Sequence, residues 1–398
     1  MNALNVKVER QNYSFIALIL CFTGLSIMSS FYSVIPLISI LSKNLSVSEG
    51  QAVWAISSFT FTFAVGCLIF GPLSDRFGRK KVMLGGLVAL TLITLFLGFQ
   101  SSLPFIIVFR GIQGIAAATF SPVVLSYVVE LFPQNKRVFA LSCISTSFLM
   151  SGIIGQVFGS FVNYRLGWQY VFIILGVIYF ILTLLMLFFI PSLPANGVSV
   201  AVAFKQMRKM LGQKSLWFAY VIALVLMLSF VGMYTSLEKF LSRPPFGFGN
   251  QQILYVRSVG ILGMLMALFA NGMVRRVGVI PVLRSALILS VVGLALLGIG
   301  TNKVFMIAMS IVFVAGIAVA IPSLVSLIGE LGGATKGAAI SIYSFVVNFG
   351  AAIGPILAVQ LLSSGNYVLT FLSLSCCLLL GLLATFFIKS MLKNSVEN

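Results

Sequence analysis

The chain has 398 residues, of which 60% are apolar and only 8% are Asp, Glu, Lys or Arg. A soluble globular domain carries about 25% charged residues, so this composition excludes an ordinary water-soluble protein. The mean hydropathy is +1.13, and apolar runs extend over whole helix lengths rather than alternating as in a membrane β-barrel. We therefore predict a polytopic α-helical membrane protein.

The net charge of +18 does not indicate nucleic-acid binding, because Lys and Arg fall in short clusters between apolar runs. The sequence has no histidine, which excludes a His-ligated metal and a His general base. We expect no metal and no cofactor. We also expect no cleavable signal, because mostly polar residues lead directly into a full-length span. Inert thiols are expected for the cysteines, which all lie in apolar runs: Cys21, Cys67, Cys143, Cys376 and Cys377.

Charged or Gly/Pro-rich breaks divide the chain into twelve apolar segments long enough to cross a bilayer. Most connections between them are very short, which makes neighbouring helices antiparallel. The predicted spans are 14–37, 51–72, 82–101, 104–131, 138–162, 168–190, 216–238, 252–272, 284–301, 304–331, 338–362 and 367–389.

The orientation of these spans follows from the basic residues in the loops, which concentrate on the cytoplasmic side of a membrane. With both termini inside, eighteen Lys and Arg fall on the cytoplasmic side and six on the outer side. Arg110 lies within a span and completes the 25 basic residues. We therefore predict that both termini are cytoplasmic.

The two halves of the chain repeat each other. A shift of 200 residues places Gly78 on Gly278, and it also aligns several polar or Pro positions: Arg76 with Arg276, Pro122 with Pro322, Ser126 with Ser326, Glu130 with Glu330 and Lys136 with Lys336. We predict six-helix bundles over 1–190 and 216–398, joined by a cytoplasmic linker, 191–215. Residues 203–214 fit either a basic amphipathic helix on the inner leaflet or a solvated linker. Parallel repeats with a substrate path between them are typical of transporters.

The loop after the second span carries the most specific motif. Residues 71–81 read GPLSDRFGRKK, which resembles the G-x-x-x-D-R-x-G-R-[RK] signature loop of the major facilitator superfamily, at the position where that family has it. Gly71 favours close helix approach, Asp75 lies beside the loop cations, and Gly78 favours a tight turn. A simple cluster of inner-side charges would explain Arg79 and the two lysines but not this spacing.

Other motifs resemble the same superfamily. Residues 110–114 read RGIQG, similar to its R-x-x-Q-G motif, and residues 130–133 read ELFP before two basic residues. Its drug and metabolite exporters have a Gly-Pro pair in a glycine-rich fifth span. Here residues 152–159 read GIIGQVFG, so that Gln156 replaces the proline, although the second half has Gly354-Pro355. The second-half signature loop is eroded, since Asn271 and Arg275 replace its first Gly and its Asp.

Charged residues within the spans are costly and indicate function or pairing. None of the seven acids is predicted at the membrane midplane, and only Glu238 could reach the interior from the outer side. Arg110 and Arg257 lie inside spans. The resemblance implies that Arg110, with Gln113, faces the central cavity or takes part in proton coupling; a helix tether is the alternative. For Arg257 the alternative to coupling or substrate binding is that its side chain extends outward to the membrane–water interface.

Two further groups of candidate residues follow. A cytoplasmic charge network, including Lys136 or Arg137, is expected to bias two conformations separated by a few kcal/mol; ordinary loop solvation is the alternative. Its expected members are Asp75, Arg76, Gly78, Arg79, Glu130, Arg137 and Glu330. Polar or aromatic residues that interrupt apolar spans are expected to line a substrate cavity: Tyr32, Ser145, Thr146, Gln156, Tyr234, Tyr343 and Asn348.

The resemblance implies a secondary transporter working by alternating access: a multi-pass monomer of the bacterial inner membrane that exports a small amphipathic drug or metabolite, siderophore-like and sugar-like compounds included, against protons. The acid-poor interior favours neutral, zwitterionic or anionic substrates over strongly cationic drugs. The sequence contains no G-x-x-x-x-G-K-[ST] loop, which argues against ATP. Alternatives are an importer of a small organic anion with the same fold, an intramembrane enzyme, for which no catalytic constellation is visible, and a channel.

Overall fold

The computed structural model describes residues 12–194, 197, 200–242, 246–299, 302–362 and 365–397, and the described elements are all helical. Three of the basic residues counted above, Lys7, Arg10 and Arg243, and the acid Glu9 lie outside these residues. The helices of the first half are α2 (Tyr13–Tyr32), η1 (Ile35–Leu37), α3 (Ile38–Asn44), α4 (Glu49–Ala52), α5 (Trp54–Phe77), α6 (Arg79–Leu97), α7 (Leu103–Ala118), α8 (Ser121–Leu131), α9 (Gln134–Leu166) and α10 (Trp168–Phe189).

The second half continues the helical pattern. Its elements are α11 (Val200–Leu211), α12 (Lys214–Leu241), α13 (Asn250–Leu265), η2 (Met266–Phe269), α14 (Ala270–Val277), α15 (Val279–Ile299), α16 (Lys303–Leu331), η3 (Gly333–Thr335), α17 (Lys336–Leu362) and α18 (Tyr367–Glu397). Within the described ranges, twelve helical segments are long and apolar enough to cross a membrane, which confirms the predicted number of spans.

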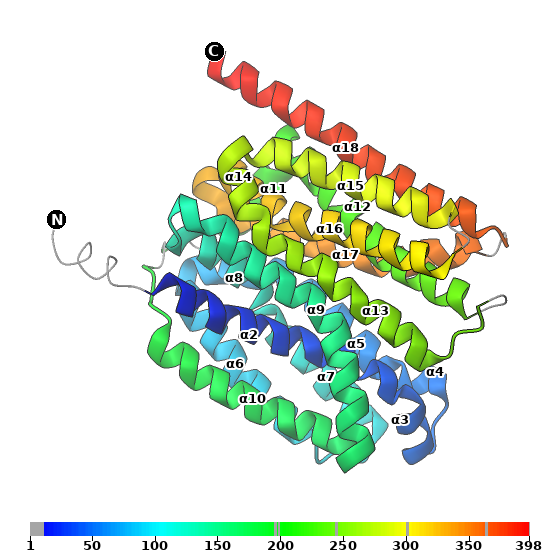
Figure 1. Cartoon of the computed structure of the whole chain (residues 1–398). Helices are drawn as coiled ribbons and strands as arrows, with labels where there is room; N and C mark the ends of the chain where they lie inside the picture. The colour runs from blue at the N-terminus through cyan, green and yellow to red at the C-terminus, as the bar shows by residue number, and fades with distance from the viewer. Residues whose placement is uncertain are drawn as a thin grey trace.

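These helices form two bundles of six spans that lie side by side. In Figure 1 the first bundle, from α2 to α10, occupies the lower part and the second, from α12 to α18, the upper part. The bundles contact each other where α5 packs on α17 and where α9 packs on α13, α14 and α16. Helix α2 begins and α18 ends at the same end of the molecule, called here the terminal end.

Glycine closes the same tight turn in both halves. Gly78 ends α5 with φ of 95°, and Gly278 ends α14 with φ of 88°. Residues with a β-carbon rarely adopt this left-handed region, so glycine is required where one span turns directly into the next. The predicted internal repeat is therefore present in the backbone, although the polar residues of the second loop have changed.

Residues 200–211 of the linker form a helix that packs against both bundles. Helix α11 contacts both α5 and α17, one from each bundle. Its Met207 and Met210 are buried, and the Thr335 hydroxyl donates a hydrogen bond to Met210 Sδ at 3.2 Å. Lys205, Arg208 and Lys209 are exposed. The linker is therefore neither wholly solvated nor a helix confined to a lipid surface, because its apolar side bridges the two bundles.

Candidate functional site

The bundles meet closely at the terminal end. A β-carbon built on Gly71 of α5 would overlap Ser341 Oγ of α17 and would lie 2.7 Å from Ser341 Cβ. A β-carbon on Gly329 of α16 would lie 3.0 Å from Cγ1 of Val129 in α8. At Gly71 this approach requires glycine, since a real β-carbon would push the helices apart, whereas at Gly329 the Val129 side chain would have to shift only slightly. The terminal end is therefore closed in this structure.

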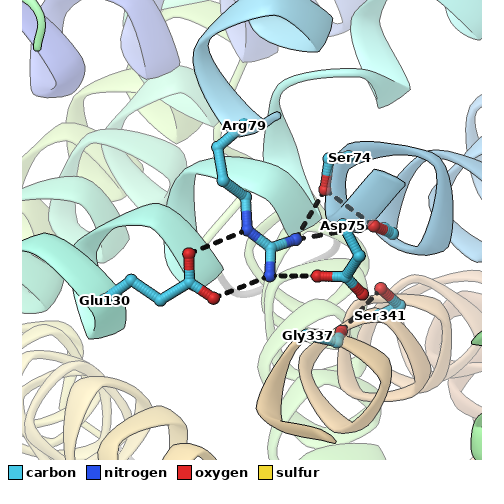
Figure 2. A network of polar contacts seen from close by, with 7 residues as sticks. Ser74, Asp75, Arg79, Glu130, Gly337 and Ser341 are labelled. Atoms are coloured by element: carbon cyan, nitrogen blue, oxygen red, sulfur yellow. Dashed lines mark hydrogen bonds and ion pairs between the residues drawn. The ribbon is translucent and has the colours of Figure 1, made fainter. Parts of the chain in front are cut away.

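Arg79 is the centre of a charge network at this closed end (Figure 2). Its guanidinium donates two hydrogen bonds to the Glu130 carboxylate, from Nε to Oε2 at 3.2 Å and from Nη2 to Oε1 at 2.9 Å. Nη2 also forms an ion pair with Asp75, and Nη1 donates to Ser74 Oγ at 2.5 Å. Arg79 is only 3% exposed, so these bonds replace the water that burial removes.

The network borders the second bundle at Gly337, the second residue of α17. A β-carbon there would lie 2.6 Å from Arg79 Nη2 and 2.7 Å from Asp75 Oδ1. The neighbouring Lys336 lies close enough for its charge to act on Glu130 and Asp75. A polar pocket of about 460 Å³ lies here between the bundles and the linker. Its lining residues are Asp75, Arg79, Glu130, Leu193, Pro194, Gln206, Gly333, Thr335, Lys336 and Gly337.

The expected charge network is only partly assembled. Arg76 is exposed and stacks on Phe77 instead of joining Arg79. Of the two cations expected to complete the network, Lys136 lies 5.0 Å from the ring centroid of Tyr13, while Arg137 interacts electrostatically with Glu330 of the other bundle.

Two carboxylates therefore each face a cation across the bundle interface. Glu130 faces Lys336, and Glu330 faces Arg137. The sequence analysis did not place Lys336 in this network, although the 200-residue repeat aligns it with Lys136.

A cavity of about 300 Å³ lies between the bundles. Apolar and aromatic side chains dominate its wall, among them Met28, Phe63, Phe148, Met227 and Phe230. Because α2 and α12 run away from the terminal end, the lining residues Tyr32 and Thr235 place part of the cavity towards the opposite end. An apolar wall with few polar groups suits an amphipathic small molecule.

Most of the predicted cavity residues line this wall. They are Tyr32, Ser145, Gln156, Tyr234, Tyr343 and Asn348. Thr146 does not: its hydroxyl points to the second bundle and donates to the Met264 carbonyl at 3.4 Å. The helical period separates it from Ser145 by about 100°, so adjacent residues face different neighbours. Sequence reasoning missed Ser121, Thr235 and Ser344, because polar residues of this size are common in membrane helices.

Arg110 lies beside the cavity, not in its wall. It is 0% exposed and ties three helices together: Nε donates to the Ala55 carbonyl at 3.0 Å, and Nη1 donates to the Ser30 carbonyl at 3.3 Å. Nη1 also donates to Gln113 Oε1 at 2.5 Å, and the guanidinium carbon lies 4.4 Å from the ring centroid of Phe59. The expectation that Arg110 and Gln113 face the cavity is thus not met; the arrangement matches the helix tether.

Glu238 and Arg257 form an ion pair, as their positions on successive helices suggested. Arg257 lines the cavity and is 21% exposed, whereas Glu238 is 50% exposed. The guanidinium carbon of Arg257 lies 5.8 Å from the ring centroid of Tyr234, one turn before Glu238 on α12. Arg257 is therefore turned into the cavity and does not simply reach outward.

Two six-span bundles with a cavity between them and a charge network at one closed end define a polytopic membrane transporter. The sequence profile of the Major Facilitator Superfamily matches residues 20–336. The chain belongs to the major facilitator superfamily.

Individual proteins resemble the chain to different extents. An uncharacterized transporter of Buchnera aphidicola subsp. Schizaphis graminum is 25% identical over 352 residues, 87% of this chain and 84% of that protein. The multidrug export protein EmrB of Escherichia coli is 31% identical over 147 residues, 36% of this chain and 29% of EmrB. The crystal structure of the human organic anion transporter MFSD10 matches with a TM-score of 0.76 at 17% identity, covering 93% of this chain and 98% of that one. This last similarity concerns the fold.

Proposed function

We propose that the protein is a secondary active transporter that exports a small amphipathic compound in exchange for protons. It works by alternating access: the bundles, residues 1–190 and 216–398, rock about the central cavity, and residues 191–215 connect them. The observation that carries this proposal is an apolar cavity between two bundles. Helix contacts and the Arg79 network close it at the terminal end. The partial similarity to EmrB favours export.

The closed terminal end corresponds, in this proposal, to a cytoplasmic gate. Both termini are placed in the cytoplasm by the positive-inside rule, and the protein is a monomer in the bacterial inner membrane. Asp75, Arg79 and Glu130, with Lys336, hold the gate shut in the outward-facing state. A two-state equilibrium separated by a few kcal/mol is sensitive to a few such contacts.

A test uses inside-out vesicles containing the overexpressed protein, supplied with labelled aromatic compounds of matched size that are neutral, zwitterionic, anionic or cationic. We expect one class to accumulate chemically unchanged when the vesicle interior is acidic, and a protonophore to abolish the accumulation. Gradient-independent equilibration would exclude active transport. Chemical conversion of the compound would point to an enzyme instead.

The alternative is import of a small organic anion by the same fold. The observation in its favour is that the cavity wall contains Arg257 and, among the described residues, neither Asp nor Glu. The direction of transport separates the two functions. An importer raises, and an exporter lowers, the amount of labelled substrate that whole cells retain relative to cells lacking the protein.

A further inference from the structure

The charge of the cavity wall comes from one residue. Among the described residues that line the cavity, Arg257 is the only one with a charged side chain. Its Nη2 atom donates to Glu238. Its Nε atom is buried and has no hydrogen-bond partner. A buried donor without a partner costs about 1–3 kcal/mol, so a hydrogen bond from a bound ligand to this nitrogen would be favourable.

Two further residues that line the cavity have side-chain oxygens without a hydrogen-bond partner. The Tyr234 hydroxyl is buried without a partner, and so is Oγ of Ser344 from α17. Tyr234 reaches α13 because Gly260 has no side chain there: a β-carbon on Gly260 would overlap the Tyr234 hydroxyl. The ring also packs against Phe230, with centroids 5.2 Å apart. Arg257 and the Tyr234 hydroxyl thus form a polar corner of the cavity, which adjoins an aromatic wall that includes Phe230.

The geometry of a guanidinium determines which ligand fits this corner. Carboxylates and sulfonates accept two parallel N–H bonds from adjacent nitrogens of one Arg. At Arg257, Nε is free and Nη2 is occupied by Glu238. An incoming anion that takes both nitrogens therefore competes with Glu238 for Nη2. Glu238 is half exposed, so water can solvate its carboxylate when the anion displaces it.

We infer that the substrate of this cavity carries an anionic group on an aromatic or apolar body, and that Glu238 is a resident counter-ion which this anion displaces from Arg257. The anion binds Nε and Nη2 of Arg257 and accepts a hydrogen bond from the Tyr234 hydroxyl. The body lies against the aromatic wall. This inference rests on the proposed function in one respect, namely that the cavity is where the transported compound binds.

The test measures equilibrium binding to the purified full-length protein in nanodiscs. Three probes share one body and differ in charge: 2-naphthoate, 2-naphthamide and 2-naphthylmethylammonium. We expect 2-naphthoate to bind at least about tenfold more tightly than the other two, a difference of about 1.4 kcal/mol. Arg257→Gln should remove this preference, whereas Glu238→Gln should tighten 2-naphthoate binding because the competitor is gone.

Two variants make the result interpretable. Arg165→Gln removes an exposed Arg at the same end of the molecule and should leave all three affinities unchanged. Arg257→Lys keeps the charge without the planar fork, and we expect an intermediate preference for 2-naphthoate. Retained binding of the neutral 2-naphthamide by Arg257→Gln shows that a lost preference reflects recognition and not misfolding.

Three results would overturn the inference: no saturable binding of 2-naphthoate, equal or tighter binding of the amide or the ammonium compound, or weaker 2-naphthoate binding in Glu238→Gln. The assay is separate from transport. If vesicles show no gradient-driven flux but the carboxylate preference depends on Arg257, secondary transport is rejected and the anion site stands.

Discussion

Ser341 of α17 occupies the space that a β-carbon on Gly71 of α5 would need. The two residues belong to different bundles, and the overlap extends beyond the hydroxyl, because Ser341 Cβ lies 2.7 Å from the position of that β-carbon. The closed end thus depends on a glycine within the signature loop. This contact gives the loop a packing role in addition to its charges.

Gly71→Ala should weaken the closed terminal end. Overpacking a tight contact costs about 1–3 kcal/mol, which shifts a balanced two-state equilibrium roughly fivefold to 150-fold. Electron–electron double resonance between labels on the terminal ends of α5 and α17 should show a larger population at long distance. Ser341→Gly should restore the short distance in the double variant, since the next neighbour, the Gly337 carbonyl oxygen, lies 3.7 Å away. Gly85→Ala is the control, because nothing lies within 4 Å of that position.

Asp75→Asn should reduce transport without preventing insertion or folding. Arg79 is buried and keeps its two hydrogen bonds to Glu130. The closed end should therefore lose about 1–3 kcal/mol of stabilisation, less than when a single isolated buried pair is broken. The measurement is the transport rate at equal membrane abundance, together with the same label distance. Lys81→Gln, a change at an exposed residue in the first turn of α6, should retain wild-type behaviour. Wild-type turnover in Asp75→Asn would remove the gate role.

Arg110→Lys should lower thermal stability as well as transport. A lysine cannot donate to the Ala55 carbonyl, the Ser30 carbonyl and Gln113 Oε1 together, and each charge-assisted hydrogen bond that is lost costs about 1.5–3 kcal/mol. Thermal unfolding of the purified protein should show a lower Tm than for the exposed control Arg165→Lys. Lost transport with an unchanged Tm would instead assign Arg110 to coupling. Normal values of both would reduce it to packing.

Met210→Gln should loosen the contact between the linker helix and the closed end. Met210 is buried on a helix that packs against α17, and an amide in its place would lose apolar contact and bury polar atoms without partners, which costs about 1–3 kcal/mol. We expect the labels on α5 and α17 to report more of the open conformation. Arg208→Gln, on the exposed side of the same helix, is the matched control. Identical distance distributions for the two variants would show that α11 does not stabilise closure.

The sequence by itself determined the twelve spans, the internal repeat and the family. Lipid satisfies no backbone group, so each crossing requires about 20 apolar residues in a helix, and this constraint is readable along the chain. The turn at Gly78 and its counterpart at Gly278 were equally predictable, because a backbone with positive φ strongly favours glycine. Asp75, Arg79 and Glu130 were identified through the spacing of motifs.

Only the tertiary structure decided what each polar side chain faces. Arg110 and Arg257 look alike in sequence, as single cations within apolar spans, yet one is tied to its own bundle and the other lines the cavity. Neighbouring residues such as Ser145 and Thr146 likewise face different surroundings. The rotation of a helix about its axis and its packing against distant segments determine these outcomes, and neither is encoded in local hydropathy.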